Sequence, residues 1–295
     1  MQAPLVFPTA SAAAAAERAA RGAAVPLVVS DMVIEGHAQA VTLRLYRPAE
    51  AQGLPVLLYF HGGGFMRGSL DEADGSARYL ARHLPALVVS VGYSLAPQFP
   101  FPAAPEDAHR AALWVQRHAR ALGGNPKHFA LAGYDAGGQL ANSLAFIARD
   151  RGDVRFAAQA LFGPMLDPSL TRLGDAEKLC SDITARECAA CYRAYLPDAS
   201  QRMHPYAAPL ESMRLAGLPA TLILTAQNDV LHREAEHYAS RLIEAGVLIQ
   251  VVRYPGVSHA ALAAHPAALQ ETVRFLRGRF DARLEAPAWM PVPLR

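Results

Sequence analysis

Three short motifs in this sequence carry groups that could act together on a small substrate. The first is His61-Gly62-Gly63-Gly64-Phe65, which follows an apolar run expected to form a strand. Consecutive glycines let the backbone turn sharply and bring N–H groups close to a ligand. A pair of such N–H groups can hold a developing oxyanion, so this motif favours chemistry at a carbonyl or carboxyl group.

The second motif is Gly133-Tyr134-Asp135-Ala136-Gly137-Gly138, which joins an expected strand to an expected helix. It has the frame of a nucleophile elbow, G-x-S-x-G, whose central side chain is exposed on a strained turn. The central residue here is Asp135. A carboxylate at a helix N-terminus is favoured in its ionised form, so Asp135 needs no base to become a nucleophile.

The third motif is a pair of titratable residues in two later loops. Asp229 follows the strand expected at 220–225, and His259 follows the strand expected at 248–254. The order elbow, Asp, His is the chain order of α/β-hydrolase triads. We therefore expect His259 to carry the proton and Asp229 to fix its tautomer.

The elements that must position these motifs alternate along the chain. Six apolar strands are expected, at 55–60, 86–91, 129–133, 158–162, 220–225 and 248–254. Helical patterns are expected at 72–83, 105–122, 138–150, 232–245 and 261–277. This alternation predicts an α/β fold with a mostly parallel sheet covered by helices on both faces. In such sheets the sites lie at the carboxyl ends of the strands.

Two stretches lie outside this alternation. The segment 166–216 is longer than one crossover needs and reads as helical and irregular. With the N-terminal arm, about residues 1–40, it is expected to form a helical cap over a single domain spanning 1–295. The Ala-rich stretch 11–24 within that arm is expected to be a helix packed on the domain.

Composition and charge exclude several classes of protein. The 295 residues are 52% hydrophobic and carry a net charge of +2, which indicates a globular chain without the basic surface of a nucleic-acid binder. No apolar run is long enough to span a membrane, and no secretory signal is recognised, so the expected location is the cytoplasm. The three cysteines do not form a disulfide framework, and Cys188-Ala-Ala-Cys191 is interpreted as part of a packed helix. No metal-ligand or cofactor motif is found, so we expect neither.

The motifs together resemble the bacterial hormone-sensitive-lipase-like esterases, an α/β-hydrolase family. The resemblance runs from about residue 40 to the C-terminus. It rests on His61-Gly-Gly-Gly-Phe65, Tyr93-Ser-Leu-Ala-Pro97, Phe101-Pro-Ala-Ala104, Glu106-Asp-Ala108, the elbow frame, Pro205-Tyr-Ala-Ala-Pro-Leu210, Asp229-Val-Leu231 with Glu234, and His259.

The resemblance implies an activity and a set of site residues. It implies short-acyl esters as substrates, oxyanion donors at the amides of Gly63, Gly64 and Ala136, and a cap, and it is compatible with a homodimer. Residues adjoining these groups are expected to shape the site: His61, Gly62, Phe65, Tyr134 and Gly137.

One departure from the family changes the chemistry. The family elbow usually reads G-D-S-A-G-G, whereas this chain has Asp135 at the position of the nucleophilic serine. An aspartate that attacked an ester would be expelled in preference to the alcohol, because a carboxylic acid has a pKa of roughly 4 and an alcohol one near that of water, about 15.7. The product of successful attack would be a reactive anhydride.

Three functions therefore remain open. The leading expectation is hydrolysis of a small, largely apolar ester, with Asp135 as nucleophile or as general base on water. The second is attack of Asp135 on an sp³ carbon, as in an epoxide hydrolase or a dehalogenase, followed by hydrolysis of the aspartyl ester. The third is a catalytically inactive site that binds a ligand, in a natural member or a Ser→Asp variant of an esterase.

Overall fold

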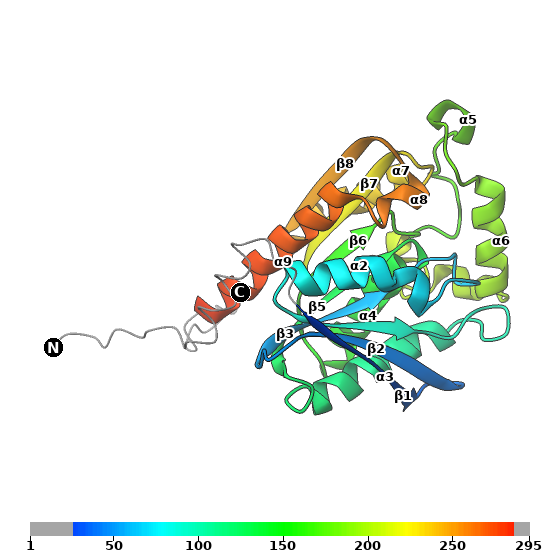
Figure 1. Cartoon of the computed structure of the whole chain (residues 1–295). Coiled ribbons are helices and arrows are strands. Elements are labelled where there is room, and N and C mark those ends of the chain that lie inside the picture. The colour runs from blue at the N-terminus through cyan, green and yellow to red at the C-terminus, as the bar shows by residue number, and fades with distance from the viewer. Residues whose placement is uncertain (1–25, 286–295) are drawn as a thin grey trace, which may run out of the picture.

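The computed structural model describes residues 26–285, and these form a single eight-stranded sheet with helices around it (Figure 1). The strands are β1 (Leu27–Glu35), β2 (Ala40–Pro48), β3 (Leu54–Phe60), β4 (Leu87–Gly92), β5 (Gly124–Tyr134), β6 (Phe156–Phe162), β7 (Ala220–Asn228) and β8 (Ile249–Ser258). The helices are α2 (Leu70–His83), α3 (Ala103–His118), α4 (Ala136–Arg151), α5 (Ala176–Leu179), α6 (Ala185–Tyr195), α7 (His232–Glu244), α8 (His259–Leu262) and α9 (Pro266–Glu285), with short 3₁₀ turns η1 (Ala199–Met203) and η2 (Pro209–Glu211).

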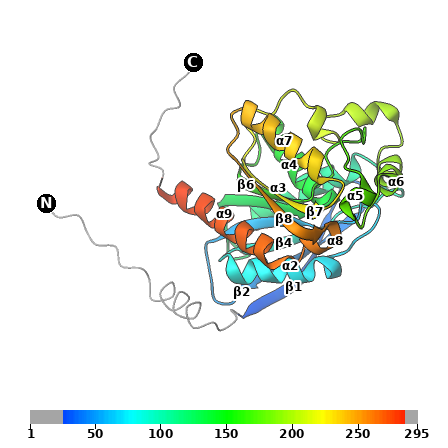
Figure 2. The ribbon, with the colours of Figure 1, turned by 90° about the horizontal axis from the view of Figure 1, so that it is seen from above.

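The sheet has the strand order β1-β2-β4-β3-β5-β6-β7-β8. The first two strands pair antiparallel, β2 pairs antiparallel with β4, and all later pairings are parallel. Helices α2, α8 and α9 cover one face, and α3, α4 and α7 cover the other (Figures 1 and 2). Because both faces are covered, the central strands are apolar along almost their whole length.

The predicted α/β-hydrolase fold with a mostly parallel sheet is confirmed, and each expected strand lies in this sheet. Strands β1 and β2 were not expected. Side chains of β1 are mostly exposed or half-buried, so its sequence lacks the continuous apolar run that marks the central strands.

One expected helix is interrupted. The stretch 261–277, predicted as one helix, is divided into α8 and α9. Pro266 begins α9. Proline has no backbone N–H to donate, and at the first position of a helix that N–H is not needed. The break leaves His259 at the start of its own short helix.

The two expected cap segments differ in what the structure describes. Residues 1–25, including the helix expected at 11–24, lie outside the described residues, and 27–35 form a strand of the main sheet. The segment 166–216 carries α5, α6 and both 3₁₀ turns, beside the carboxyl edge of the sheet (Figure 1).

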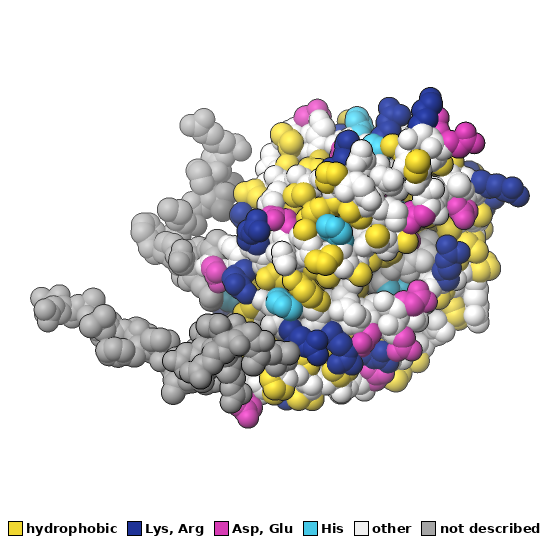
Figure 3. Space-filling view, turned by 45° about the horizontal axis from the view of Figure 1, so that its top comes forward, with side chains coloured by type: hydrophobic (Ala, Val, Ile, Leu, Met, Phe, Trp, Pro, Cys, Tyr) yellow, Lys and Arg dark blue, Asp and Glu magenta, His cyan; other side chains and the backbone are white. Residues whose placement is uncertain are grey.

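The surface carries side chains of both charges, as the low net charge predicts. On the face shown in Figure 3, basic and acidic side chains are interspersed. No helix among residues 26–285 is both long enough and apolar enough to cross a membrane.

The elbow glycines are placed where strand and helix backbones nearly touch. A Cβ atom on Gly137 would overlap the carbonyl oxygens of Phe60 and His61, and one on Gly133 would overlap the carbonyl of Gly137. These neighbours are backbone atoms and cannot rotate away. The close approach of β3, β5 and α4 therefore requires glycine at both positions.

We predict that Gly137→Ala lowers the free energy of unfolding by about 1–3 kcal/mol through overpacking. The matched control is Gly75→Ala in the middle of α2, where no atom lies within 4 Å of the added methyl group. That control should be more stable than the unmodified protein by up to about 1 kcal/mol. Urea denaturation of both variants checks this. Equal stability of the two variants would contradict the proposed contact.

Candidate active site

Asp135 lies on the turn between β5 and α4 in a strained conformation. Its φ is +56°, which is uncommon for a residue with a side chain. Two backbone hydrogen bonds fix the conformation of the turn. The Asp135 amide donates to the carbonyl of Phe162 at 2.9 Å, and the amide of Gln139 donates to the Asp135 carbonyl at 3.2 Å. The expected elbow geometry is thus present, although the residue is only 7% exposed.

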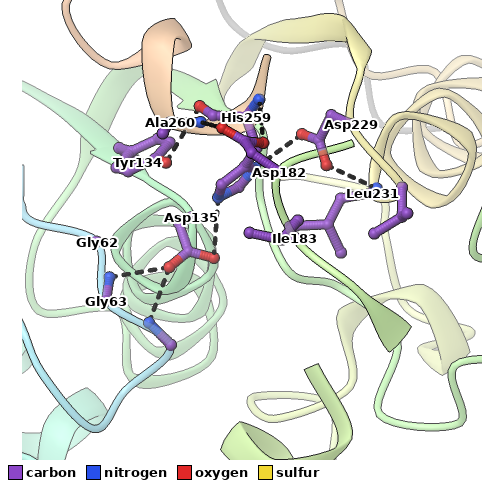
Figure 4. A network of polar contacts seen from close by, with 12 residues as sticks. Gly62, Gly63, Tyr134, Asp135, Asp182, Ile183, Asp229, Leu231, His259 and Ala260 are labelled. Atoms are coloured by element: carbon purple, nitrogen blue, oxygen red, sulfur yellow. Dashed lines mark hydrogen bonds and ion pairs between the residues drawn. The ribbon is translucent and has the colours of Figure 1, made fainter. Parts of the chain in front are cut away.

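The two oxygens of the Asp135 carboxylate have different partners (Figure 4). Oδ2 accepts hydrogen bonds from the amides of Gly63 at 2.9 Å and Gly64 at 2.8 Å. Oδ1 lies 3.6 Å from Nε2 of His259. The two glycine amides, which were expected to hold a substrate oxyanion, therefore hold one oxygen of Asp135.

Ala136, the third expected oxyanion donor, begins α4. The first amides of a helix have no partner within the helix. The Asp135 carboxylate makes no capping hydrogen bond to α4, so it does not occupy this N–H group. The Ala136 amide therefore stays a predicted oxyanion donor.

His259 connects the elbow to the third expected residue, Asp229. Its Nδ1 lies 2.8 Å from Oδ2 of Asp229, and both side chains are buried. The other oxygen of Asp229 accepts a hydrogen bond from the Leu231 amide at 2.8 Å. Asp229 is thereby fixed, and it orients the imidazole so that Nε2 faces Asp135.

The charges of this triad stabilise one another. Burial raises the pKa of Asp135, but His259 and the amides of Gly63 and Gly64 outweigh it and hold this pKa below its usual value. Burial lowers the pKa of His259, but the carboxylates of Asp229 and Asp135 outweigh it and raise this pKa to about 10. At neutral pH the site therefore holds a carboxylate at Asp135 and an imidazolium at His259.

The expected shaping residues hold the glycine turn. The ring of His61 stacks on Tyr93 with centroids 4.3 Å apart, and its Nδ1 lies 2.8 Å from the Gly62 carbonyl. Burial lowers the pKa of His61, which favours the neutral ring. Phe65 stacks on Tyr195 of α6 with centroids 3.9 Å apart. These contacts position the turn without bringing the rings of His61 or Phe65 to the reacting atoms.

Tyr134, which precedes the elbow, supports the other side of the site. Its hydroxyl donates to the carbonyl of His259 at 3.1 Å, and the two rings lie 4.9 Å apart. The predicted shaping residue Gly137 allows the close backbone approach described above. Most of the predicted site residues line one pocket: His61, Gly62, Gly63, Gly64, Tyr134, Asp135 and His259. Asp229 lies behind His259 (Figure 4), whereas Phe65, Ala136 and Gly137 are not part of the pocket lining.

The pocket over the triad has a volume of about 530 Å³. Its wall includes side chains of the 166–216 segment that the sequence did not assign to the site: Asp182, Ile183, Glu187, Cys188 and Cys191. The two cysteines had been interpreted as helix packing, and Cys188 is indeed buried on α6, while both sulfhydryl groups are free. No spacing rule identifies a pocket wall contributed by a neighbouring segment.

No group of three or more His, Cys, Asp or Glu side chains within residues 26–285 is arranged to hold a metal ion.

We predict that His259 titrates near pH 10, as its pKa is raised to about 10. Imidazole ¹⁵N chemical shifts measure this directly. In Asp135→Asn one of the two carboxylate partners is lost, so the pKa should fall toward the usual 6.5.

The same shift implies that stability depends on pH. A histidine with a raised pKa in the folded state contributes stability fully below about pH 6.5, and that contribution is lost as pH rises through about 10. The free energy of unfolding should therefore decline over this window, and His259→Gln should lack that part of the decline. A His259 titration near 6.5 in the unmodified protein would contradict the paired arrangement.

Comparison with known proteins places these features in a family. A family model described as alpha/beta hydrolase fold matches residues 57–263. The chain is 39% identical to esterase LipI of Mycobacterium tuberculosis (80% of this chain, 78% of the relative) and 35% identical to ethyl acetate hydrolase of Pseudomonas putida (79% and 76%). A hyperthermophilic esterase from the archaeon Pyrobaculum calidifontis has a similar structure, with a TM-score of 0.79, 35% identity and coverage of 93% of this chain and 89% of that one. The chain therefore belongs to the alpha/beta hydrolase fold family.

Proposed function

We propose that this protein hydrolyses short-chain carboxylic esters, with Asp135 as general base and His259 as general acid. Relatives named as esterases support the reaction class. A pocket of about 530 Å³ supports a small substrate. The observation that carries the assignment of roles is the division of the Asp135 carboxylate, with Oδ2 on the glycine amides and Oδ1 beside His259.

A direct attack of Asp135 on the ester carbonyl is disfavoured for two reasons. The tetrahedral intermediate would expel the carboxylate more readily than an alkoxide, since the carboxylic acid is much the stronger acid. The amides of Gly63 and Gly64 also hold an oxygen of Asp135 in the position where a substrate oxyanion would be stabilised. Attack by water avoids the first difficulty because no bond to Asp135 is formed, and the second is eased when Asp135 takes up a proton and releases the glycine amides.

The proposed reaction conserves the charges of the site. Oδ1 of Asp135 accepts a proton from a water molecule as that water attacks the ester carbonyl. The negative charge that develops on the carbonyl oxygen is stabilised by the Ala136 amide. The amides of Gly63 and Gly64 also become available to it, because Asp135 is neutral once it has accepted the proton. Nε2 of His259 donates its proton to the departing alcohol oxygen. A proton then passes from Asp135 to His259 across their 3.6 Å separation and restores the starting state.

The 166–216 segment is proposed to act as the cap of this site. Ile183, Cys188 and Cys191 from this segment line the pocket. A Cβ on Gly64 would overlap the sulfur of Cys191, so α6 lies directly against the glycine turn. The segment thereby limits the size of the substrate and excludes bulk water from the triad.

A second candidate is attack of Asp135 on an sp³ carbon, as in epoxide or haloalkane hydrolysis. It is favoured by the position of Oδ2, because the carbonyl oxygen of an aspartyl ester would already lie on the glycine amides. The substrate-activating groups that such chemistry requires are poorly placed. Epoxide opening needs acidic tyrosine hydroxyl groups from the cap, and Tyr192, Tyr195 and Tyr206 of the 166–216 segment do not line the pocket. The tyrosines that do, Tyr59 and Tyr134, belong to strands β3 and β5.

The tryptophans do not support halide binding either. Trp114 is on α3, stacked on His118, and does not line the pocket. Trp289 lies outside the described residues. A site that only binds a ligand remains the third hypothesis, and it requires saturable binding of the ester without product.

We predict that the pH dependence of ethyl acetate hydrolysis, whose alkoxide leaving group needs a proton, distinguishes this site from a serine triad. The unmodified protein should keep a flat rate through neutral pH and lose activity as pH rises through about 10, where His259 loses its proton. In Asp135→Ser, one carboxylate partner is lost and a neutral imidazole is needed as base, so the rate should rise with pH near neutrality. Asp135→Asn should lose at least about a hundredfold in kcat.

Identical rising profiles in the unmodified protein and Asp135→Ser would contradict the base role of Asp135. An inactive unmodified protein with an active Asp135→Ser would show that the ester-binding scaffold is intact but that ester hydrolysis is the wrong assignment. His259→Gln should be inactive in both backgrounds.

We also predict where water oxygen goes in a single turnover in H₂¹⁸O. With Asp135 as base, the label enters the product acid and the peptide containing Asp135 keeps its mass. An aspartyl-ester intermediate would place ¹⁸O in the Asp135 carboxylate when water attacks the aspartyl carbonyl. Mass spectrometry of the product acid and of the peptide containing Asp135 locates the label. Label in Asp135 after one turnover would overturn the general-base role in favour of covalent chemistry.

A further inference from the structure

The backbone of the catalytic histidine is held by a carboxylate from outside the triad. Oδ1 of Asp182 accepts a hydrogen bond from the His259 amide at 3.0 Å, and Oδ2 accepts one from the Ala260 amide at 2.9 Å (Figure 4). These are the first two amides of α8, which have no partner within so short a helix. The hydroxyl oxygen of Ser258 accepts a hydrogen bond from the next amide, that of Ala261, at 3.4 Å.

Asp182 belongs to the 166–216 segment and is 77 residues from His259 in sequence. The stretch around it also contacts the loop of Asp229. Ser181 accepts a hydrogen bond from the Val230 amide at 3.3 Å, and the Gly174 amide donates to the Val230 carbonyl at 2.8 Å. One stretch of the segment is therefore bonded to both loops that carry the imidazole and its carboxylate partner.

The charge of Asp182 is also close to the triad. Burial raises the pKa of Asp182, but the Ala260 amide, Ser258 and the charge of His259 outweigh it and lower this pKa. Asp182 is therefore ionised at neutral pH. A third carboxylate beside the backbone of His259 adds to the negative potential around the imidazolium.

We propose that Asp182 is a positioning residue for catalysis, through which the 166–216 segment sets the orientation and protonation of His259. This inference rests on the proposed function, because it assigns Asp182 a part in the ester hydrolysis by His259. Asp182 contacts no reacting atom, so its effect must pass through the backbone of His259 and Ala260. A displacement of the imidazole by a fraction of an ångström is enough to lower the rate of proton transfer.

Asp182→Asn tests this proposal. An asparagine keeps one acceptor oxygen but turns its NH₂ group toward the second backbone N–H, so one of the two hydrogen bonds is lost. We expect kcat for p-nitrophenyl acetate to fall between about ten- and a hundredfold with KM changed less than about threefold. The pKa of His259, followed by imidazole ¹⁵N shifts, should also fall. Asp182→Glu, which keeps both oxygens, should restore part of the lost kcat.

The matched control is Asp175→Asn in the same segment. Asp175 accepts hydrogen bonds from the amides of Glu177 and Lys178 at the start of α5, another four-residue helix, but it does not line the pocket. Its substitution removes the same charge, and because both amides donate to Oδ1 alone, the asparagine oxygen can keep both hydrogen bonds. The kcat and the His259 titration should therefore stay unchanged.

The two measurements separate this inference from the proposed function. If the protein does not hydrolyse esters, the ¹⁵N titration still reports whether Asp182 acts on His259. A His259 pKa that is the same in Asp182→Asn and the unmodified protein overturns the proposal, as does an unchanged kcat in an active enzyme. A loss of kcat as large in Asp175→Asn as in Asp182→Asn also overturns it, because the effect would then be a general loosening of the segment.

Discussion

The arrangement of the site depends on keeping ionised groups paired inside a buried pocket. Burial alone would neutralise Asp135 and His259, since moving a charge out of water is costly. Each charge is instead matched. Asp135 has two backbone amides and the imidazole, and His259 has a carboxylate on each side of its ring. Removing any partner would leave a buried charge without compensation, which explains why the loops around the triad are so closely bonded to one another.

The sheet makes this pairing possible. The glycine turn follows β3, the elbow follows β5, and the loops of Asp229 and His259 follow β7 and β8. Because these strands are parallel, their carboxyl ends meet at one edge, and groups far apart in sequence converge there. The elbow adds strain at Asp135, with φ of +56°, and the glycines beside it let β5 and α4 approach closely enough to aim the carboxylate at the amides.

A carboxylate at the elbow changes the chemistry of an otherwise familiar scaffold. In a Ser-His-Asp triad the imidazole must be neutral in order to accept a proton from the hydroxyl group. Here a second carboxylate stabilises the imidazolium, so the histidine is suited to donating a proton. In the proposed mechanism acid and base therefore exchange places relative to the serine triad, with Asp135 accepting the proton from water. One side chain thus decides whether the histidine of this fold is neutral or protonated at neutral pH, because a carboxylate replaces a neutral hydroxyl group beside it.

The sequence by itself determined the fold class, the central strands and the motifs around the site. These follow from local signals: continuous apolar strands, glycines at close approaches, and the order of Asp135, Asp229 and His259 along the chain. Tertiary structure alone decided that the amides of Gly63 and Gly64 hold Asp135, that α8 is separate from α9, and that Asp182 bonds the backbone of His259. Hydrogen bonds over such separations leave no periodicity or spacing in the sequence, and a pKa depends on the sum of all neighbouring charges and on burial. Those quantities exist only once the chain has folded.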